Sequence, residues 1–411
     1  MTYIRLEMLR EIVIEIYLTI FKLVFTLFKL CPLKDKAVFV VSFSQNNLYI
    51  YNEIKRKEIP IEIIFLVKKS CINDFKNVSD AKVIPFETAN IMNMLVSIYH
   101  LASSKYVIVD NYFGFLSSVT FKKGVDCIQL WHAAGAIKTF GWKDQSIKNR
   151  SAHARKRFEK VYKQFNKVVV GSEAMASIFI QAFNLSTENM LRTGVPRTDL
   201  FYDKNMQQKI IRRLYQENPV LKDKKVILYA PTYRDSQLNK VNHVAIDIEE
   251  MYRQLKDEYV LLLKFHPAIK LSEDLKSEYK EFAYDYSSYR DINELLLVTD
   301  ILITDYSSIP HEFAILNRPM IFFPYDLNEY NSERGLWGPY EELVPGPIAY
   351  TTTEILSLIK ENHFDYNKIQ DFNKKWNLYS DGHSCKRLVE FLFMDVTAQD
   401  EKERKAAREV L

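Results

Sequence analysis

Short apolar runs alternate with longer segments of helical periodicity along most of the chain after residue 33. Runs rich in Val, Ile, Leu and Phe and bounded by polar or turn residues are typical of strands buried on both faces of a parallel sheet. The first half of the chain contains five such runs and the second half contains four. We predict strands at 37–43, 62–67, 106–110, 126–131, 167–171, 225–230, 259–265, 301–304 and 319–323.

This series of strands occurs twice, with a polar helical bridge at 200–224 between the halves. Alternation of buried strands with helices predicts an α/β fold. We therefore expect two Rossmann-like doubly wound domains that face a cleft, an N-terminal one at 33–200 and a C-terminal one at 201–395. The final segment, 396–411, is charged and has no apolar stripe, so it is predicted to be a tail.

The most apolar stretch of the chain is 9–31, near the N-terminus. A membrane span needs about 20 uninterrupted apolar residues, and charges interrupt this stretch. Its polar residues recur every three or four positions, which places them on one narrow stripe of a helix. We expect residues 1–32 to form an amphipathic helix that lies in a bilayer interface, or that packs on the protein body or on a second subunit. The stripe consists of Glu11, Glu15, Thr19, Lys22, Thr26 and Lys29.

The overall composition is that of an ordinary folded protein with enough apolar residues for two cores. The 411 residues are 47% hydrophobic and 26% charged, and the net charge is +4. This balance excludes a disordered chain, a collagen and a disulfide scaffold. Only 10 residues are glycine, and neither a G-x-G pair nor a P-loop pattern occurs. Any phosphate must therefore be bound without the usual glycine-rich loop.

Cysteine and histidine are dispersed along the chain. The four cysteines contain no C-x-x-C pair, and the eight histidines form neither H-x-x-x-H nor H-E-x-x-H. This spacing indicates isolated thiols in a reducing compartment rather than a zinc site or a disulfide framework. We expect no bound cofactor and no metal site made of protein ligands alone, and no residue pattern bears on a requirement for free Mg²⁺.

Side chains that can bind a ligand or take part in catalysis follow several of the predicted strands. Ligands of open α/β sheets bind beyond the carboxyl ends of the strands, so residues directly after the strands are the first candidates for a site. Two histidines, an arginine and several hydroxyls are expected at this edge. The candidates are His132, Thr232, Arg234, His266, Asp305, Ser307 and Ser308.

The segment 301–316 predicts a strand, a tight turn and a helix. Ser307 or Ser308 can cap that helix, and Pro310 fits its first turn. A helix start with free N–H groups and two hydroxyls suits a phosphate. The alternative is an ordinary capped helix without a ligand. The neighbouring Arg234 and His266 favour the anion site.

Two histidines stand at strand ends in opposite halves of the chain. His132 follows the run 126–131 and precedes small residues, which leave room for a substrate. A histidine at a strand end is often only structural, yet imidazole titrates near neutrality and can accept a proton from a hydroxyl. His266 is predicted to face the same cleft and, when protonated, to stabilise negative charge on a phosphoryl group.

One segment carries a strong charge bias. Nine basic residues and two acidic ones lie between 143 and 167, and the basic ones include Arg155 and Arg157. Such a run is either a solvated helix face or a surface for anionic lipid headgroups or a lipid diphosphate. No nucleic-acid motif accompanies it, so we expect no nucleic-acid partner. Lys22 and Lys29 would be the lipid-facing cations of the N-terminal helix.

The segment 319–347 is dense in aromatic residues, proline and glycine. Long connections of this kind within compact domains are usually functional. We predict an ordered loop that lines the site. Arg334 within it would contact a phosphate or form a surface salt bridge.

Several motifs together resemble the CDP-glycerol glycerophosphotransferase family of teichoic-acid synthesis. The similarity runs in order over roughly 125–350, and the TDYSS block with its Pro-Tyr-Asp sequel is highly specific. The more variable residues 36–110 look like the N-terminal Rossmann-like half of that family. The motifs are LWHAAGAIKTFG, GVPRTDLF, LYAPTYRD, LLLKFHP, LLLVTDILITDYSSIPHEFAILNRPMIFFPYDLNEY and RGLW…YEELVPGP.

The resemblance implies a GT-B-type fold and a peripheral enzyme at the cytoplasmic face of the cell membrane. It would transfer glycerol phosphate from CDP-glycerol to a hydroxyl of an undecaprenyl-diphosphate-linked saccharide and release CMP. His132 matches the base proposed for the family and His266 its second essential histidine. The residues that match its nucleotide and phosphate site are Thr232, Arg234, Asp305, Ser307, Ser308 and, less closely, Arg334.

Two departures from the family pattern bear on the type of transferase. Trp131-His132-Ala133-Ala134 stands where the long polymerases carry W-H-G-T, and the chain has a single module. These features favour a primase or short-primer transferase over a polymerase. His311-Glu312 stands where an aromatic residue followed by Asp is common. The alternatives are a polymerase or capsule polymer transferase of the same family, a nucleotide-sugar glycosyltransferase or epimerase, and a non-catalytic membrane scaffold.

Overall fold

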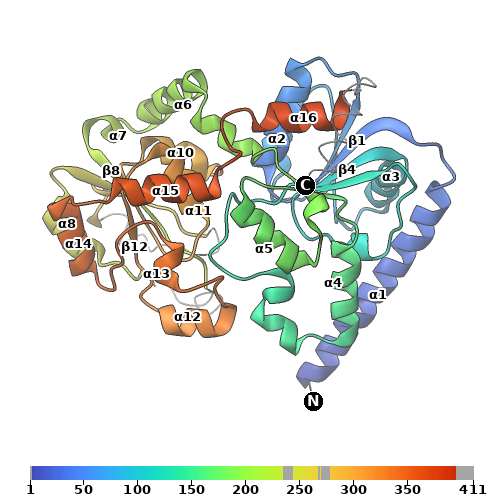
Figure 1. Cartoon of the computed structure of the whole chain (residues 1–411), viewed down its shortest axis with the longest axis horizontal. Coiled ribbons are helices and arrows are strands. Elements are labelled where there is room, and N and C mark those ends of the chain that lie inside the picture. The colour runs from blue at the N-terminus through green and yellow to red at the C-terminus, as the bar shows by residue number, and fades with distance from the viewer. Residues whose placement is uncertain (1, 235–243, 267–268, 270–277, 395–411) are drawn as a thin grey trace.

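The computed structural model describes residues 2–234, 244–266, 269 and 278–394. The predicted tail at 396–411 lies outside the described residues. Two parallel sheets stand next to each other, each with helices around it (Figure 1). The α/β character predicted from the alternating runs is confirmed.

The first sheet contains seven strands in the order β3-β2-β1-β4-β5-β6-β7. All of its strand pairs are parallel. The central strands are buried on both faces, which explains their continuous apolar runs. The strands are β1 Lys34–Val41, β2 Glu62–Val67, β3 Lys82–Pro85, β4 Ser104–Val109, β5 Asp126–Gln129, β6 Lys167–Val169 and β7 Met190–Leu191.

The second sheet contains five strands in the order β10-β9-β8-β11-β12, and its pairs are also parallel. Helices flank both sheets and connect them. The strands are β8 Lys225–Ala230, β9 Tyr259–Leu263, β10 Ala283–Asp285, β11 Ile301–Thr304 and β12 Met320–Phe322. The helices are α1 Thr2–Phe28, α2 Ser44–Arg56, α3 Ile91–Ala102, α4 Ala152–Tyr162, α5 Glu173–Phe183, α6 Lys204–Glu217, α7 Val220–Asp223, α8 Ile248–Leu255, α10 Ile292–Val298, α11 Ile309–Phe313, α12 Leu327–Arg334, α13 Tyr340–Leu343, α14 Thr352–Glu361, α15 Tyr366–Trp376 and α16 Ser384–Phe393.

Three strands were not predicted, namely β3, β7 and β10. β3 and β10 are partly exposed, and β7 has only two residues. All three stand at sheet edges, where a strand buries less side-chain surface and needs no continuous apolar run. The predicted helical bridge at 200–224 contains α6 and α7, and the predicted loop at 319–347 contains α12 and α13.

The last described helix crosses back to the first half of the chain. α16 packs beside α2, and Leu388, Val389 and Leu392 belong to the same apolar cluster as the first sheet. An ion pair of 2.8 Å joins Lys57 to Glu390. In Figure 1, α16 lies over the first half although its sequence follows α15 of the second. The range 201–395 therefore does not form one continuous unit, because its last helix belongs to the layer of the first sheet.

Helix α1 lies along the outer edge of the first half (Figure 1). Leu18, Phe21 and Phe25 are buried against the body, and the Phe21 ring stacks on Phe115 with centroids 5.3 Å apart. A second apolar stripe faces away from the protein. We call it the outer stripe of α1, and it consists of Leu9, Ile12, Val13, Ile16, Ile20, Leu23, Leu27 and the adjacent Leu30.

One apolar face of α1 packs on the body, which is one of the alternatives expected for this segment, and the other apolar face is uncovered. The bilayer interface stays a prediction. In the part of the chain that the structure describes, no helix combines the length and hydropathy of a membrane span.

Candidate functional site

A cavity of about 570 Å³ lies between the two halves of the chain. It is lined by residues that directly follow β4, β5, β8 and β11 and by two residues of α12. The strand-end rule therefore places the cavity correctly. Its lining is Asn111, Tyr112, Trp131, His132, Ala133, Gly135, Ala136, Ile137, Lys138, Thr139, Phe140, Asp144, Thr232, Tyr233, Tyr306, Ser307, Ser308, Tyr330 and Arg334.

The His132 ring is held between two aromatic rings at the wall of this cavity. Phe43 stacks on it at a centroid distance of 4.2 Å and Trp131 at 4.3 Å. Trp131 has φ of 59°, a left-handed conformation that is unusual for a bulky residue. This backbone turn, directly before His132, sets the direction in which the imidazole leaves the strand end.

A hydrogen bond determines which nitrogen of His132 carries the proton. Nδ1 lies 3.0 Å from the carbonyl oxygen of Asp110. A carbonyl only accepts, so Nδ1 is the donor, and Nε2 of the neutral ring keeps its lone pair. Burial lowers the pKa of His132 to about 4, although the bond to Asp110 opposes this shift. The imidazole is therefore neutral at physiological pH and can accept a proton at Nε2.

Asp110 itself is a buried anchor between β1 and β4. Its carboxylate accepts hydrogen bonds from the backbone N–H groups of Ser42 and Phe43, from the Ser42 hydroxyl and from the amide of Asn47, at 2.8–3.0 Å. Burial raises the pKa of Asp110 to about 6, and the donors oppose that effect. This network fixes the carbonyl that orients His132.

Hydroxyl groups line the opposite wall. Ser307 and Ser308 precede α11, and the Ser307 hydroxyl accepts a hydrogen bond from the Ile309 N–H. Helix α11 has only five residues, so its dipole is small and the hydroxyls dominate this wall. The Thr232 Oγ1 and Tyr112 Oη atoms are buried and have no hydrogen-bond partner among the described residues. Buried polar atoms of this kind are available to a ligand.

Arg234 occupies a different position from the one expected. Its guanidinium donates to Asp326 at 2.9 and 2.8 Å and to Asp305 at 2.6 Å. It lies close to the rings of Tyr306, Tyr325 and Tyr330. Burial opposes its charge, but the hydrogen bond to Asp326 and the charge of Asp305 outweigh burial and raise the pKa of Arg234.

Asp305 is likewise directed into the protein and not into the cavity. It accepts hydrogen bonds from the backbone N–H groups of Thr232, at 2.8 Å, and of Tyr306, at 2.6 Å. Asp305 and Arg234 thus hold the two strand ends that carry Thr232 and Ser307 in position. Neither of the two lines the cavity.

His266 also lies outside the lining of the cavity. It is exposed, and its ring contacts that of Tyr233 at a centroid distance of 4.5 Å. Tyr233 lines the cavity, so His266 lies beside a residue of the lining without being part of it. The expected convergence of the two imidazoles stays a prediction.

Arg334 lines the cavity as predicted, and the segment after it pairs with the segment after His132. Lys138 and Leu336 form an antiparallel bridge, the Thr139 N–H donates to the Gly335 carbonyl at 3.1 Å, and the Trp337 N–H donates to the Ile137 carbonyl at 3.0 Å. Residues from both halves therefore form one continuous wall. Lys138 was not predicted as a site residue. It lies nine residues beyond the end of β5, whereas the prediction covered only residues that directly follow a strand.

A buried ion pair braces the loop that carries His132. Arg197 donates through Nε to Glu312 Oε1 at 3.0 Å, and the Ala134 N–H donates to the same oxygen at 3.3 Å. A Cβ on Gly135 would lie 2.0 Å from the His311 ring. His311 and Glu312, where this chain departs from the family pattern, thus both pack against the histidine loop.

The residues expected to face lipid fall into two groups. Lys22 and Arg157 line a groove of about 490 Å³ between α1 and α4, together with four further basic residues, His153, Lys156, Lys160 and Lys163. Arg157 also forms 2.8 Å ion pairs with Glu11 and Glu15 of α1. Arg155 and Lys29 do not line this groove, and Arg155 is exposed.

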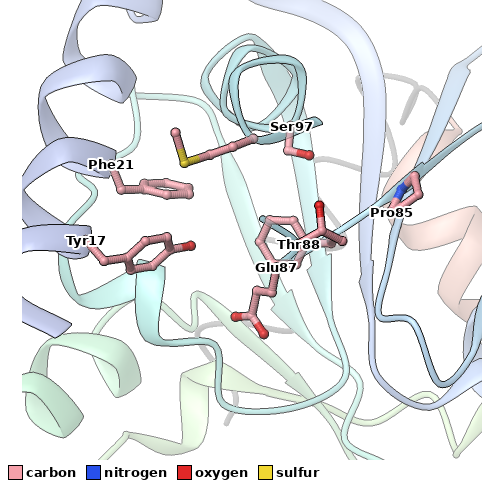
Figure 2. Close-up of a pocket in the computed structure, with 8 residues that line it drawn as sticks. Tyr17, Phe21, Pro85, Glu87, Thr88 and Ser97 are labelled. Carbon is pink, nitrogen blue, oxygen red and sulfur yellow. The ribbon is translucent and has the colours of Figure 1, made fainter. Parts of the chain in front are cut away.

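A second cavity, of about 310 Å³, lies under α1. Figure 2 shows Tyr17 and Phe21 of α1 directed toward Glu87 and Thr88, with Ser97 of α3 on the far side. Burial and the charge of Glu87 raise the pKa of Tyr17 to about 12. None of these residues lines the cavity that contains His132.

Comparison with known proteins places this arrangement in one family. A family model described as CDP-Glycerol:Poly(glycerophosphate) glycerophosphotransferase matches residues 23–394. The teichoic acid glycerol-phosphate primase of Bacillus subtilis is 38% identical over 362 residues, which cover 87% of this chain and 92% of the primase.

Two further relatives differ in what they show. The teichoic acid poly(ribitol-phosphate) polymerase of Bacillus spizizenii is 37% identical over 380 residues, which cover 90% of this chain but only 58% of the polymerase. The structure of the H548A variant of the wall teichoic acid polymerase TagF has a TM-score of 0.77 at 24% identity, covering 98% of this chain and 99% of that one, and shows the same fold. The chain therefore belongs to the CDP-Glycerol:Poly(glycerophosphate) glycerophosphotransferase family.

Proposed function

We propose that this protein transfers glycerol phosphate from CDP-glycerol to a hydroxyl of an undecaprenyl-diphosphate-linked saccharide in wall teichoic acid synthesis, and that it releases CMP. We further propose that it adds the first unit or first few units. Family membership supports the donor class. The 38% identity to a teichoic acid glycerol-phosphate primase, which aligns over 92% of its own length, supports the primase role.

One observation carries the proposed chemistry, namely the orientation of His132. Its Nδ1 proton is engaged by the Asp110 carbonyl, so Nε2 is the basic atom of a ring that lines the cavity. A hydroxyl that approaches Nε2 can transfer its proton to it as the oxygen attacks phosphorus. Positioning and charge stabilisation account for most of the catalysis in phosphoryl transfer.

The opposite wall is assigned to the donor diphosphate. The Ser307, Ser308 and Thr232 hydroxyls can donate hydrogen bonds to phosphate oxygens, and Arg334 supplies positive charge. Arg234 and Asp305 act as positioning residues, since their charged groups are engaged with each other. The role of His266 in stabilising negative charge stays a prediction, and it would act from beside Tyr233.

We also propose that the protein works at the cytoplasmic face of the membrane. The outer stripe of α1 is uncovered, with Leu23 62% and Leu27 66% exposed. The basic groove between α1 and α4 lies beside that helix. An apolar face next to basic residues is the arrangement that binds an interfacial helix to anionic lipid.

The decisive experiment replaces His132 by alanine. The purified variant is incubated with CDP-glycerol and a lipid-linked disaccharide, and the products are weighed by mass spectrometry. Loss of a general base is expected to reduce turnover by about 10²- to 10⁴-fold. His363→Ala is the matched control, because His363 is exposed and lines neither the cavity nor the basic groove. Near-normal turnover of His132→Ala would remove His132 from the mechanism.

The same assay separates the alternatives. Parallel reactions with CDP-ribitol identify the alditol, and the product mass gives the number of units. Release of a nucleoside diphosphate from a nucleotide sugar would identify a glycosyltransferase instead. A scaffold without catalytic activity would release no CMP with either donor.

A further inference from the structure

Lys138 is fixed in the cavity by both halves of the chain. Its backbone forms the antiparallel bridge to Leu336, and the hydrogen bonds of Ile137 and Thr139 to the same segment flank it. Lys138 lies six residues after His132 on one wall, while Leu336 follows Arg334 on the other. The position of Lys138 therefore depends on the contact between the two halves of the chain at Leu336. Lys138 is one of the residues that line the cavity.

The ammonium group of Lys138 has no ion pair and no hydrogen bond with any described residue, in contrast to the two nearby arginines. Arg234 is paired with Asp305 and Asp326, and Arg197 is paired with Glu312. A partly buried cation without a counterion is costly in a folded protein. Such a group is usually kept because a ligand supplies the missing charge.

The electrostatic surroundings indicate where that ligand lies. Burial lowers the pKa of Lys138, the charges of Arg334 and Arg234 lower it further, and the charge of Asp305 opposes them. The charge of Lys138 in turn contributes to the lowered pKa of His132. Lys138 thus lies within electrostatic range of both the base on one wall and the arginine on the other.

The remaining polar groups of the cavity favour phosphate as the ligand. Thr232 Oγ1 is a buried hydroxyl that has no hydrogen-bond partner among the described residues, and Ser307 and Ser308 line the same space. An ammonium group and several hydroxyl donors in one cavity match the tetrahedral oxygens of a phosphate better than a neutral ligand.

We propose that the Lys138 ammonium binds the phosphate group that carries the alditol, which is the group transferred in the reaction. This inference rests on the proposed function and names one of its binding residues. The bond from the acceptor oxygen to this phosphorus forms while the bridging P–O bond breaks. The hydroxyl proton passes to His132 Nε2, and the electron pair of the broken bond leaves on the CMP phosphate. Lys138 neutralises charge on the non-bridging oxygens throughout.

The test compares Lys138→Met and Lys138→Arg with the wild-type protein. Methionine has a side chain of similar length to lysine but no charge, whereas arginine keeps the positive charge. Calorimetric titrations use CDP, CMP and cytidine as ligands. Lys143→Met is the matched control, because Lys143 is exposed and lies outside the cavity lining.

Loss of a charge-assisted hydrogen bond should weaken CDP binding by Lys138→Met by about 10- to 100-fold. Cytidine binding should not change, and CMP binding should change less than that of CDP because CMP lacks the second phosphate. Turnover should fall with Lys138→Met and recover in part with Lys138→Arg. The melting temperature of Lys138→Met should equal or exceed that of the wild type, since an uncompensated charge is removed.

Two results would overturn the inference. One is CDP affinity and turnover of Lys138→Met within twofold of the wild type. The other is a lowered melting temperature that accompanies the loss of binding and is not restored by arginine, which would show a structural role. A wild-type protein that neither binds CDP nor turns over a CDP-alditol would instead reject the proposed function, so the two failures are distinguishable.

Discussion

Arg197 and Glu312 form an ion pair that links the two halves of the protein behind the loop that carries His132. The two residues are 115 positions apart, and the Glu312 side chain is only 1% exposed. The backbone N–H of Arg197 also donates to Asn46, whose amide donates to the Trp131 carbonyl. The pair therefore connects both halves to the unusual backbone turn at Trp131.

Replacing Glu312 by alanine should destabilise the protein strongly, because it leaves the Arg197 guanidinium buried without a counterion. The expected loss in free energy of unfolding is about 3–5 kcal/mol. It is measured by urea denaturation, and turnover should fall with it because the Ala134 N–H loses its acceptor. Glu159→Ala removes a partner of Lys163 whose side chain is 50% exposed, and it should leave the urea midpoint unchanged. Equal midpoints for the two variants would show that the Arg197–Glu312 pair does not hold the halves together.

Gly135→Ala should disturb the histidine loop through steric overlap. The added methyl group would lie 2.0 Å from the His311 ring, which is itself fully buried. Overpacking of this kind costs about 1–3 kcal/mol, and the loop can relieve it only by moving His132. Gly114→Ala is the control, because nothing lies within 4 Å of the added atom there. If the two variants have the same stability and turnover, the close packing of Gly135 on His311 is not required.

His311 should make stability depend on pH in the acid range. Burial lowers its pKa to about 4 from the ordinary value near 6.5. The unfolded chain therefore binds a proton at a pH where the folded protein does not, so stability is fully present above about pH 6.5 and falls as the pH drops toward 4. The contribution of this group is about 3 kcal/mol over that interval.

His311→Asn tests this effect, because its amide can still donate to the Ser308 carbonyl that Nδ1 contacts at 2.9 Å. Urea denaturation of both proteins at several pH values between 7.5 and 4 gives the two stability curves. The variant should be less stable at pH 7.5 but should lose less stability on acidification. Parallel curves would contradict the buried neutral state of His311.

The outer stripe of α1 should be required for binding to membranes. Leu23→Asn with Leu27→Asn removes two exposed leucines and leaves the buried residues Phe21 and Phe25 unchanged. Vesicle binding should weaken by about 10²- to 10⁴-fold, since each of the two leucines contributes about 1.5–3 kcal/mol on burial. Flotation with vesicles that contain anionic phospholipid measures it.

The control for this experiment is Leu378→Asn, the same type of substitution at a residue that is 57% exposed and far from α1 in the sequence. It should bind vesicles as the wild type does. All variants should keep the wild-type melting temperature, because the replaced side chains are largely exposed. Undiminished flotation of the double variant would mean that the stripe meets another protein surface instead.

Strands could be predicted from the sequence wherever they are buried on both faces. β2, β8 and β11 match their predicted bounds to the residue, because a parallel strand that is buried on both faces reads as a nearly continuous apolar run. The edge strands were missed since that requirement is relaxed there. The rule that ligands bind at strand ends then placed His132, Thr232, Ser307 and Ser308 in one cavity.

Charge pairing could not be predicted in the same way. Arg234 follows a strand end and was expected to meet a phosphate, but Asp326, 92 residues later, engages its guanidinium. Nothing in the sequence distinguishes Lys138, yet its ammonium lies at the cavity and no residue in the described part of the chain forms an ion pair with it. The residue types are visible in the sequence, whereas the partner of each charge is brought close only by folding.

The sequence by itself therefore determined the parallel α/β fold, the sheet edge at which the candidate site residues lie, and the polar stripe of the N-terminal segment. Those features follow from periodicity, which acts between residues near in sequence. Only the tertiary structure decided which half of the apolar surface of α1 is covered, which cations are neutralised, and that Tyr233 lines the cavity while His266 beside it does not. These depend on contacts between residues far apart in the chain, which local patterning does not encode.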